Sequence, residues 1–299
     1  MRKMDAATAA KLKLISAMVI FGTIGLFRRY IPFASGTIAF CRGAVGTLFL
    51  LLFALMRGEK LSAAAIRKNL PVLLLSGALI GFNWIFLFEA YNYTTVATAT
   101  LSYYFAPVFV ILLSPLVLHE RLTAKKLICV AVALAGMVCV SGVLQSGFTD
   151  GTGMKGILFG LAAAVLYASV MLLNQKLDGV SAYEKTIMQL SAAAVVVLPY
   201  VLIKEADSFV APDAKAVVML FVVCVVHTGL AYVLYFGSMK DLKAQTVAVF
   251  SYIDPVLAVL LSAVVLHENI GIIGYVGAVL ILGATLVSET DTNKKSKET

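Results

Sequence analysis

Residues 107–120 read PVFVILLSPLVLHE, and residues 255–268 read PVLAVLLSAVVLHE. Aligned at an offset of 148, residues 103–120 and 251–268 are identical at ten of 18 positions. An apolar bias alone repeats some Val and Leu residues, but it does not repeat a Pro, a Ser and a closing His-Glu pair in the same register. The chain is therefore an internal duplication.

The composition identifies the chain as a membrane protein. Of its 299 residues, 61% are hydrophobic and 13% are charged, and the mean hydropathy of +0.96 lies far outside the range of soluble domains. A helical span needs about 20 mainly apolar residues to cross roughly 30 Å of hydrocarbon. The sequence predicts an all-α integral membrane protein with ten transmembrane helices, at about residues 12–27, 34–56, 70–90, 95–118, 124–144, 156–175, 183–203, 214–236, 244–266 and 270–288.

The duplication determines how these ten spans divide. The first copy closes the fourth span and the second closes the ninth, so each unit has five spans. Because five is an odd number, the two units cross the membrane in opposite directions. The sequence thus predicts two inverted five-helix repeats, residues 12–144 and 156–288, followed by a polar cytoplasmic tail at residues 289–299.

The net charge of +8 reflects topology and not nucleic-acid binding. If the N-terminus is cytoplasmic, 18 of the 24 Lys and Arg residues fall on the cytoplasmic side and five on the other, with Arg42 inside a span. This bias agrees with the positive-inside rule. It predicts a protein of the inner or plasma membrane with both termini in the cytoplasm.

Motifs of catalysis and cofactor binding are missing from the sequence. The four cysteines all fall in predicted spans as small packing residues, so neither a disulfide framework nor a metal site is indicated. HERLT and HENIG lack the second His of a zinc motif, and the chain holds no Gly-rich phosphate loop and no GxSxG turn. We therefore expect no enzyme activity, no cofactor and no ATP-driven pumping.

The two closing motifs resemble those of a known transporter superfamily. APVFVILLSPLVLHERLT, its copy DPVLAVLLSAVVLHENIG, Arg42 in the second span and the ten-span count are similar to the drug/metabolite transporter superfamily, in particular to EamA-type proteins with two EamA repeats. The resemblance covers roughly residues 12–288 and implies a helical bundle around a central cavity that transports or exchanges small metabolites, often amino acids, without ATP. The first span, ISAMVIFGTIGLF, lacks the glutamate that four-span multidrug relatives use, so coupling to protons or another ion needs a different residue.

Charged residues inside the predicted spans are the first candidates for a substrate or coupling site. Arg42 lies about eight residues inside the second span, Asp254 near the middle of the ninth and Glu89 near the outer end of the third. A charge at the bilayer centre costs about 2.5–3.5 kcal/mol on insertion scales, so it normally faces a cavity or a partner. We expect Asp254 to belong to the substrate or coupling site. For Arg42, a role in that site and a structural pairing are both open. Glu89 lies close enough to the span end to reach headgroup water.

Neutral polar residues extend the candidate set, each with two interpretations. Asn83 and Gln189 either line the site or form hydrogen bonds between helices. His227 in the eighth span either relays protons or is a core histidine with a satisfied partner. The two closing His-Glu pairs lie at span ends and are expected to cap the next helix.

Aromatic residues near these positions can wall an amphipathic ligand. Trp84 and Tyr91 are seven residues apart and share a helix face, and Tyr103 lies one turn before the repeat position that becomes Asp254. A cation above such a ring gains about 0.5–2 kcal/mol.

Two prolines occupy matching positions in the two units. Pro107 and Pro255 each remove a backbone donor, and the sequence places both in mid-helix. Paired irregularities in corresponding helices often mark the binding site of a transporter. We expect these prolines to act as hinges.

Together these features predict a secondary transporter, an exporter or exchanger, that moves a small organic metabolite across the lipid bilayer by alternating access. Asp254 and Arg42 favour an amino-acid-like, zwitterionic or cationic substrate, and Asp254 is placed either to bind an amine or to carry a coupling proton. The alternatives are a lipid or sugar-lipid flippase, which needs a side opening between helices, and a non-transporting membrane scaffold or sensor, which produces no flux.

Overall fold

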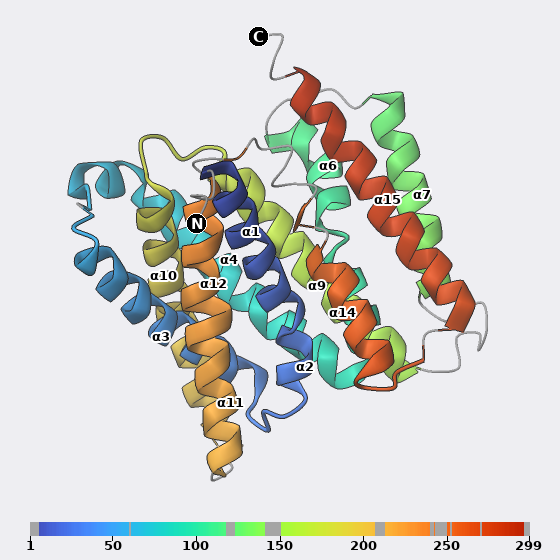
Figure 1. Ribbon diagram of the computed structural model, residues 1–299, viewed down its shortest axis with the longest axis horizontal. Coiled ribbons are helices and arrows are strands. Elements are labelled where there is room, and N and C mark those ends of the chain that lie inside the picture. The colour runs from blue at the N-terminus through green and yellow to red at the C-terminus, as the bar shows by residue number, and fades with distance from the viewer. Residues whose placement is uncertain are drawn as a thin grey trace, which may run out of the picture.

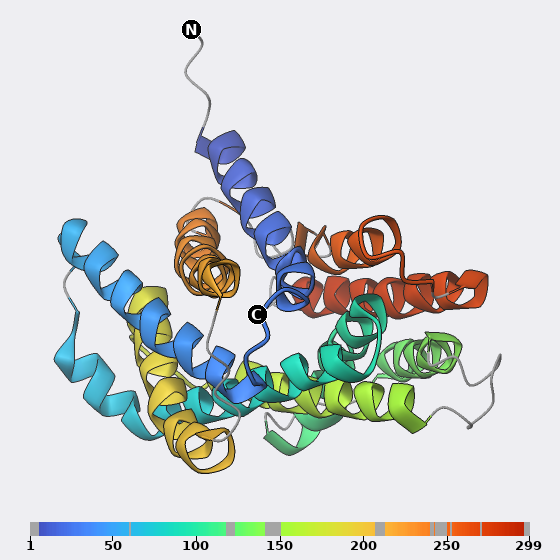
Figure 2. The same cartoon turned by 90° about the horizontal axis from the view of Figure 1, so that it is seen from below.

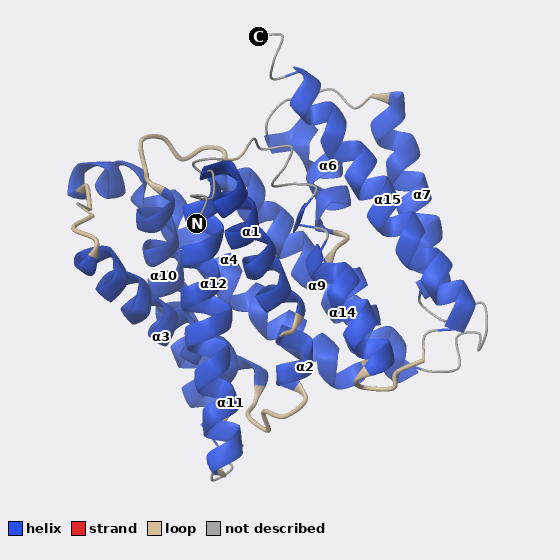
Figure 3. Ribbon diagram, viewed as in Figure 1, coloured by secondary structure: helices blue, strands red, loops and turns tan. Residues whose placement is uncertain are grey.

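The structure is a computed structural model that describes residues 6–59, 61–117, 123–140, 151–206, 213–239, 242, 250–251, 253–269 and 271–295. Every regular element in this part of the chain is a helix (Figure 3). The expected all-α class is confirmed.

The helices include enough long apolar segments for a multi-pass membrane protein. Three shorter apolar helices, Leu127–Val140, Ile253–Val264 and Gly271–Ala284, fall where the fifth, ninth and tenth spans are expected. Seven segments of the described chain are long and apolar enough to cross a membrane, namely Ala7–Arg28, Ser35–Met56, Ala63–Tyr93, Val96–Leu113, Gly153–Asn174, Ala182–Lys204 and Ala214–Ser238.

Three of the predicted spans consist of helices joined end to end. The first combines α1 with α2, the fourth α5 with α6, and the eighth α11 and α12 with the π-helical turn η3. In chain order the helices are α1 (Ala6–Gly22), α2 (Ile24–Arg28), α3 (Ser35–Met56), α4 (Ala63–Tyr93), α5 (Val96–Tyr103), α6 (Ala106–Val117), α7 (Ala124–Val140), α9 (Gly151–Asn174), α10 (Ala182–Lys204), α11 (Ala214–Cys224), η3 (Val225–Leu230), α12 (Ala231–Met239), α14 (Ile253–Val264) and α15 (Gly271–Lys295).

The interruption of the first span has a local cause. Thr23, between α1 and α2, donates its Oγ1 hydroxyl to the Ile20 carbonyl over 2.7 Å. Its own N–H also bonds to Ile20, over 3.2 Å, in place of a bond one residue further back. A Thr side chain that competes for a helix carbonyl in this way bends the helix. The sequence analysis did not predict this break.

Two helices differ from their expected lengths. α4 runs for 31 residues instead of spanning residues 70–90, and the Ser62 hydroxyl caps it by accepting from the Ala65 N–H over 3.2 Å. At 1.5 Å per residue, α4 is about 46 Å long and extends beyond the hydrocarbon layer. α15 continues to Lys295, so most of the stretch expected as a tail extends the last helix.

The helices pack in pairs that join the two halves of the chain (Figures 1 and 2). α3 packs against α10, α5 against α14 and α7 against α15, while α4 packs against α9 and α1 against α12. α7 and α15 approach closely where Gly136 meets Gly277. A Cβ on Gly136 would lie 2.8 Å from the Gly277 carbonyl oxygen, and one on Gly277 would lie 2.5 Å from that of Gly136. The two halves are therefore interleaved.

The surface of the bundle is apolar, as contact with lipid requires. Large apolar side chains such as Leu55, Met56, Leu116 and Ile272 are at least 70% exposed. An apolar surface of this extent is unusual for a protein surrounded by water. The start of α1 and the end of α15 lie at the same end of the bundle, the upper end in Figure 1.

Candidate substrate site

Arg42 lies on the inner side of α3, in the core around Trp84 and Phe88. It is 4% exposed, and its guanidinium carbon lies 4.0 Å from the centre of the Trp84 ring and 5.4 Å from that of Phe88. Both distances are within the range of a cation–π contact. Trp84 and Phe88 are one helical turn apart on α4, so a single face of that helix supports the cation.

A π-helical turn holds the third side of Arg42. The Arg42 Nε donates to the Thr228 hydroxyl over 3.0 Å, and Thr228 belongs to η3. The Thr228 hydroxyl donates to the Val223 carbonyl, five residues earlier, over 3.2 Å. π-turns insert a residue into an α-helix and often occur at functional sites because they redirect side chains. Here the turn orients Thr228 toward the cation.

Asp254 lies in the first turn of α14 and is half-buried. Its Oδ2 accepts a hydrogen bond from the Tyr104 hydroxyl over 2.6 Å. This length is typical of a hydroxyl bonded to a carboxylate. Tyr104 occupies the junction between α5 and α6, so the interrupted fourth span and the ninth span meet at this bond.

Aromatic side chains connect the surroundings of Arg42 to those of Asp254. Tyr91 and Tyr103 belong to the core that also contains Trp84 and Phe88. Tyr103 contacts the Tyr104 ring, with 6.0 Å between centres. The described residues contain no ion pair between Arg42 and Asp254; the ion pairs there are Arg29–Glu268 and Lys68–Asp178. Arg42 and Asp254 therefore contact one connected group of aromatic side chains and form no ion pair with each other.

The two terminal nitrogens of the buried Arg42 side chain have no hydrogen-bond partner among the described residues. They offer several N–H donors in the planar arrangement that suits a carboxylate.

The side-chain amides of the two candidates Asn83 and Gln189 form hydrogen bonds between helices. Asn83 donates to the Ala163 carbonyl on α9 over 2.6 Å. Gln189 donates to the Ser76 hydroxyl over 2.7 Å and to the Asn174 side-chain oxygen over 2.6 Å. These contacts join α4, α9 and α10. We therefore leave both amides out of the proposed site.

Glu89 and His227 lie outside the pair of charges. Glu89 accepts from the Asn92 side chain over 3.3 Å near the end of α4 and interacts electrostatically with Arg28. His227 is 1% exposed, and its Nε2 lies 2.9 Å from the Thr23 hydroxyl at the break of the first span. Since His227 adjoins Thr228 on η3, it connects the Arg42 environment to that break.

Sequence reasoning missed two residues that hold the charged groups. Tyr104 belongs to the repeated segment and matches Tyr252. Comparing the two repeats could therefore have identified Tyr104 as a candidate. Thr228 follows the candidate His227 directly, but nothing in the local sequence indicates the π-turn that directs it toward Arg42. That turn depends on packing against α3, which sequence periodicity does not describe.

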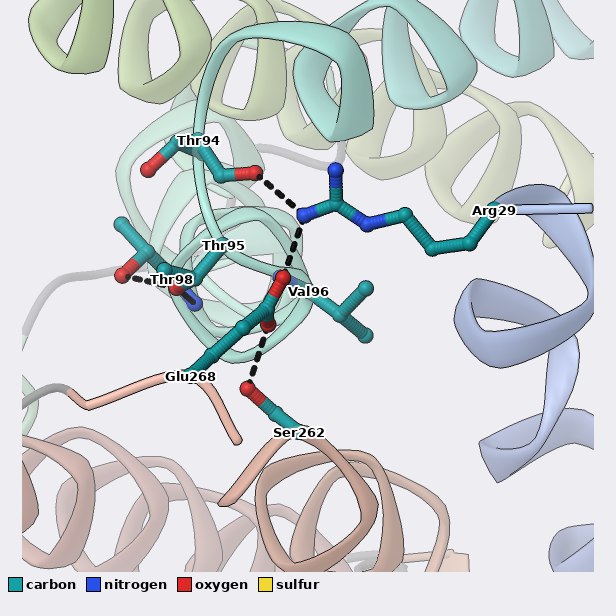
Figure 4. A network of polar contacts seen from close by, with 7 residues as sticks. All are labelled: Arg29, Thr94, Thr95, Val96, Thr98, Ser262 and Glu268. Carbon is teal, nitrogen blue, oxygen red and sulfur yellow. Dashed lines mark hydrogen bonds and ion pairs between the residues drawn. The ribbon is translucent and has the colours of Figure 1, made fainter. Parts of the chain in front are cut away.

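The second closing motif caps a different helix from the one expected. One oxygen of Glu268 accepts from the Val96 N–H at the start of α5 over 2.8 Å and from the Ser262 hydroxyl over 2.6 Å (Figure 4). Its other oxygen pairs with Arg29. The expectation that Glu268 caps the following helix is therefore wrong. The partner comes from the first half of the chain, because α5 packs against α14.

The two prolines do not lie in mid-helix. Pro107 is in the first turn of α6, which begins at Ala106, and Pro255 is in the first turn of α14, which begins at Ile253. A first turn needs no donor from its own helix, so proline fits there without breaking an intrahelical bond. For the fourth span, the irregularity is the junction at Tyr104 and Phe105, and Pro107 follows it after Ala106.

The variant Pro107→Ala is expected to slow transport without loss of folded protein. It restores an N–H that can bond to the Tyr103 carbonyl and so join α5 to α6 as one continuous helix. Flux in liposomes should fall several-fold, with normal yield and a single elution peak. Pro115→Ala, inside α6, serves as a matched control. Unfolded protein with both Pro107→Ala and Pro255→Ala would show that these prolines hold the fold and are not hinges.

No metal or disulfide chemistry is evident in the described part of the chain. It contains no group of three or more His, Cys, Asp or Glu side chains arranged to hold a metal ion. The four cysteines are all described and all free.

Comparison with known proteins places the chain in one family. The EamA-like transporter family matches it twice, over residues 9–142 and 154–290. The Bacillus subtilis protein named "Uncharacterized transporter YxxF" is 28% identical over 274 residues, which cover 89% of this chain and 86% of that protein. "Protein RarD" of Salmonella typhi is 27% identical over 195 residues, which cover 65% and 64% of the two chains.

The fold also matches a solved structure. A chain described as "Crystal structure of protein" superposes with a TM-score of 0.64 at 22% identity, covering 94% of this chain and 97% of its own length. At this identity the likeness concerns the fold alone.

Proposed function

Since the chain belongs to the EamA-like transporter family, we propose that it is a secondary transporter of the cell membrane that moves an amino-acid-like zwitterion by alternating access. The observation that carries the proposal is the pair of charged residues Arg42 and Asp254, which contact one connected group of aromatic side chains and form no ion pair with each other. Each isolated charge costs about 2.5–3.5 kcal/mol at the centre of a bilayer on insertion scales. A zwitterionic ligand neutralises both at once.

Each end of the proposed ligand has a matching partner. Its carboxylate accepts from the terminal nitrogens of Arg42, whose orientation Thr228 and Trp84 maintain. Its amine lies against the Asp254 carboxylate, which keeps one oxygen free of the Tyr104 hydroxyl. In an empty transporter, Asp254 can instead hold a proton that the substrate displaces, which would couple transport to a proton gradient.

The proposed architecture is a pair of inverted five-helix units with both termini in the cytoplasm. The pairing of helices supports it, because exchanging the units turns several of the contacts into others that are also present. The α4–α9 contact becomes α12–α1, and the α6–α9 contact becomes α14–α1. The α3–α10 and α7–α15 contacts each return to themselves. In this proposed architecture the site lies between the units, where rocking exchanges access.

A ligand screen followed by counterflow tests the proposal. Purified protein is heated with amino acids, polyamines, nucleobases and quaternary amines, since a specific ligand raises the unfolding temperature of the state that it binds. We expect zwitterions to stabilise the protein and to exchange across liposomes without ATP. Stabilisation by lipids alone, with movement of labelled lipid between leaflets, would replace the proposal with a flippase. Absence of any flux would indicate a scaffold or sensor.

A further inference from the structure

The short helix α2 is joined to α1 at Gly22 and Thr23, where neighbouring helices approach closely. A Cβ on Gly22 would lie 2.8 Å from the Asp254 carbonyl oxygen and 3.1 Å from the Leu257 Cβ. The next residue, Thr23, lies 2.9 Å from the His227 Nε2. The break in the first span therefore contacts the backbone of Asp254 on one side and, through His227, the turn that holds Arg42 on the other.

Beyond the break, α2 is held by contacts at one end of the bundle. Phe27 packs against the His227 ring with 4.7 Å between centres, and Arg28 donates to the Asn92 side-chain oxygen over 2.9 Å. Gly25 lies against Val96 so closely that a Cβ there would be 2.4 Å from the Val96 Cγ1. α2 thus fits against the end of α4 and the start of α5.

Figure 4 shows the outermost of these contacts, the pair between Arg29 and Glu268. Arg29 also donates to the Thr94 carbonyl over 3.3 Å. The pair joins the end of the first span to the loop after α14 and to the connection between α4 and α5. Parts of both halves of the chain therefore meet at this one ion pair.

We propose that α2 is a gate, hinged at Gly22 and Thr23, and that the Arg29–Glu268 ion pair is the latch that keeps it closed. The opening of this gate serves the transport cycle of the proposed function. In the inverted topology the gate lies on the outer side of the membrane. Its hinge contacts the Asp254 backbone directly and the turn that holds Arg42 through His227, so occupancy of the site and the position of α2 are linked through the Gly22–Asp254 and Thr23–His227 contacts.

The latch is suited to opening and closing. The side chain of Arg29 is 37% exposed, so water replaces its partner when α2 moves away. Glu268 keeps the Val96 N–H and the Ser262 hydroxyl after the pair separates, so no bare carboxylate is left buried. Exposed ion pairs contribute little to stability, and such a contact can open during each cycle.

One feature of the closed position favours opening. The Nε of Arg28 is enclosed and has no hydrogen-bond partner in the described chain, although its terminal nitrogens bond to Ile31 and Asn92. A buried donor without a partner is unfavourable, and water can satisfy it once α2 moves. In the closed gate, the Arg29–Glu268 ion pair is favourable and the unpartnered Arg28 Nε is unfavourable. These opposing contributions allow α2 to alternate between two positions.

Distances between spin labels at Tyr30 and Ile272 test the gate. Both positions are exposed, Tyr30 next to Arg29 at the end of α2 and Ile272 at the start of α15 beyond Glu268. The labels are placed in full-length protein whose four native cysteines are replaced by Ala, in lipid nanodiscs and without substrate. Arg29→Gln and Glu268→Gln remove the ion pair, while Gln at 268 can still accept from the Val96 N–H.

The longer-distance population should rise about threefold in either variant. The double variant should equal the larger single effect, because both changes break one contact. Lys68→Gln is the matched control, since it breaks an ion pair of 2.8 Å with Asp178 at the other end of α4. It should leave the distances unchanged. Unchanged distances in both latch variants, or an equal change in Lys68→Gln, would overturn the gate.

This measurement is independent of the proposed function. The distances are recorded without ligand and without flux. If the chain does not transport zwitterions, the latch variants still lengthen the distances, while counterflow is absent. If the gate is wrong, counterflow of the wild-type protein remains and the distances do not respond to the variants.

Discussion

Replacing Asp254 by Asn is expected to reduce counterflow of the zwitterionic substrate by about ten- to a hundredfold, because contacts to charged groups contribute about 1.5–3 kcal/mol. Asn keeps the size of the side chain and can still accept from the Tyr104 hydroxyl, but it removes the negative charge. The variant should therefore purify as a single species. If Asp254 carries the coupling proton, the remaining flux should also lose its pH dependence.

Two further variants separate charge from local structure. Asp178→Asn makes the same chemical change in the exposed connection between α9 and α10, where a hydrogen bond from Lys68 lowers the pKa of the Asp178 carboxyl. This control also removes a negative charge at neutral pH and should leave flux unchanged. Tyr104→Phe removes the bond to Asp254 but keeps its charge and should lower flux only several-fold. Wild-type flux and pH dependence in Asp254→Asn would make this carboxylate a structural partner only.

Replacing Arg42 by Gln is expected to abolish binding of ligands through their carboxylate with little change in the unfolding temperature of the empty protein. The variant loses a cation–π contact of about 0.5–2 kcal/mol and one hydrogen bond to Thr228. It also removes a charge whose burial costs about 2.5–3.5 kcal/mol, so the opposing effects nearly cancel. Arg42→Lys should keep the charge but bind at least about tenfold more weakly, because an ammonium cannot form the planar paired contact.

Arg57→Lys is the matched control for Arg42. Arg57 also lies over an aromatic ring, with 5.4 Å between its guanidinium carbon and the centre of Phe53, but it is exposed at the end of α3. The unfolding temperature and the ligand-induced shift should both stay as in the wild-type protein. A large fall in the unfolding temperature of Arg42→Gln without ligand would instead assign Arg42 to the fold.

The sequence predicted the helical class and the approximate place of the seven long apolar segments because both follow from hydropathy. It did not predict where spans break. Thr23 interrupts the first span through a side-chain bond to its own helix, and the π-turn at Val225–Leu230 packs against α3. Hydropathy records only how apolar a stretch is, so these interruptions inside apolar stretches produce no signal.

The sequence also selected the charged residues but not their partners. It named Arg42, Trp84 and Asp254, yet it could not show that the Trp84 ring is occupied by Arg42. Helical periodicity predicts which residues share a face, whereas the facing helix is decided by tertiary packing. For the same reason the repeat identified Glu268 as a closing residue but not as the cap of α5.

The most direct test of the two-charge site compares three forms of one ligand found in the screen: the zwitterion, its carboxamide and its N-acetyl derivative. The thermal stabilisation of wild-type protein should require both charges of the ligand. Arg42→Gln should no longer distinguish the zwitterion from the carboxamide, and Asp254→Asn should no longer distinguish it from the N-acetyl form. If wild-type protein binds all three forms equally, or each variant loses discrimination at the opposite end of the ligand, then Arg42 and Asp254 do not form the substrate site.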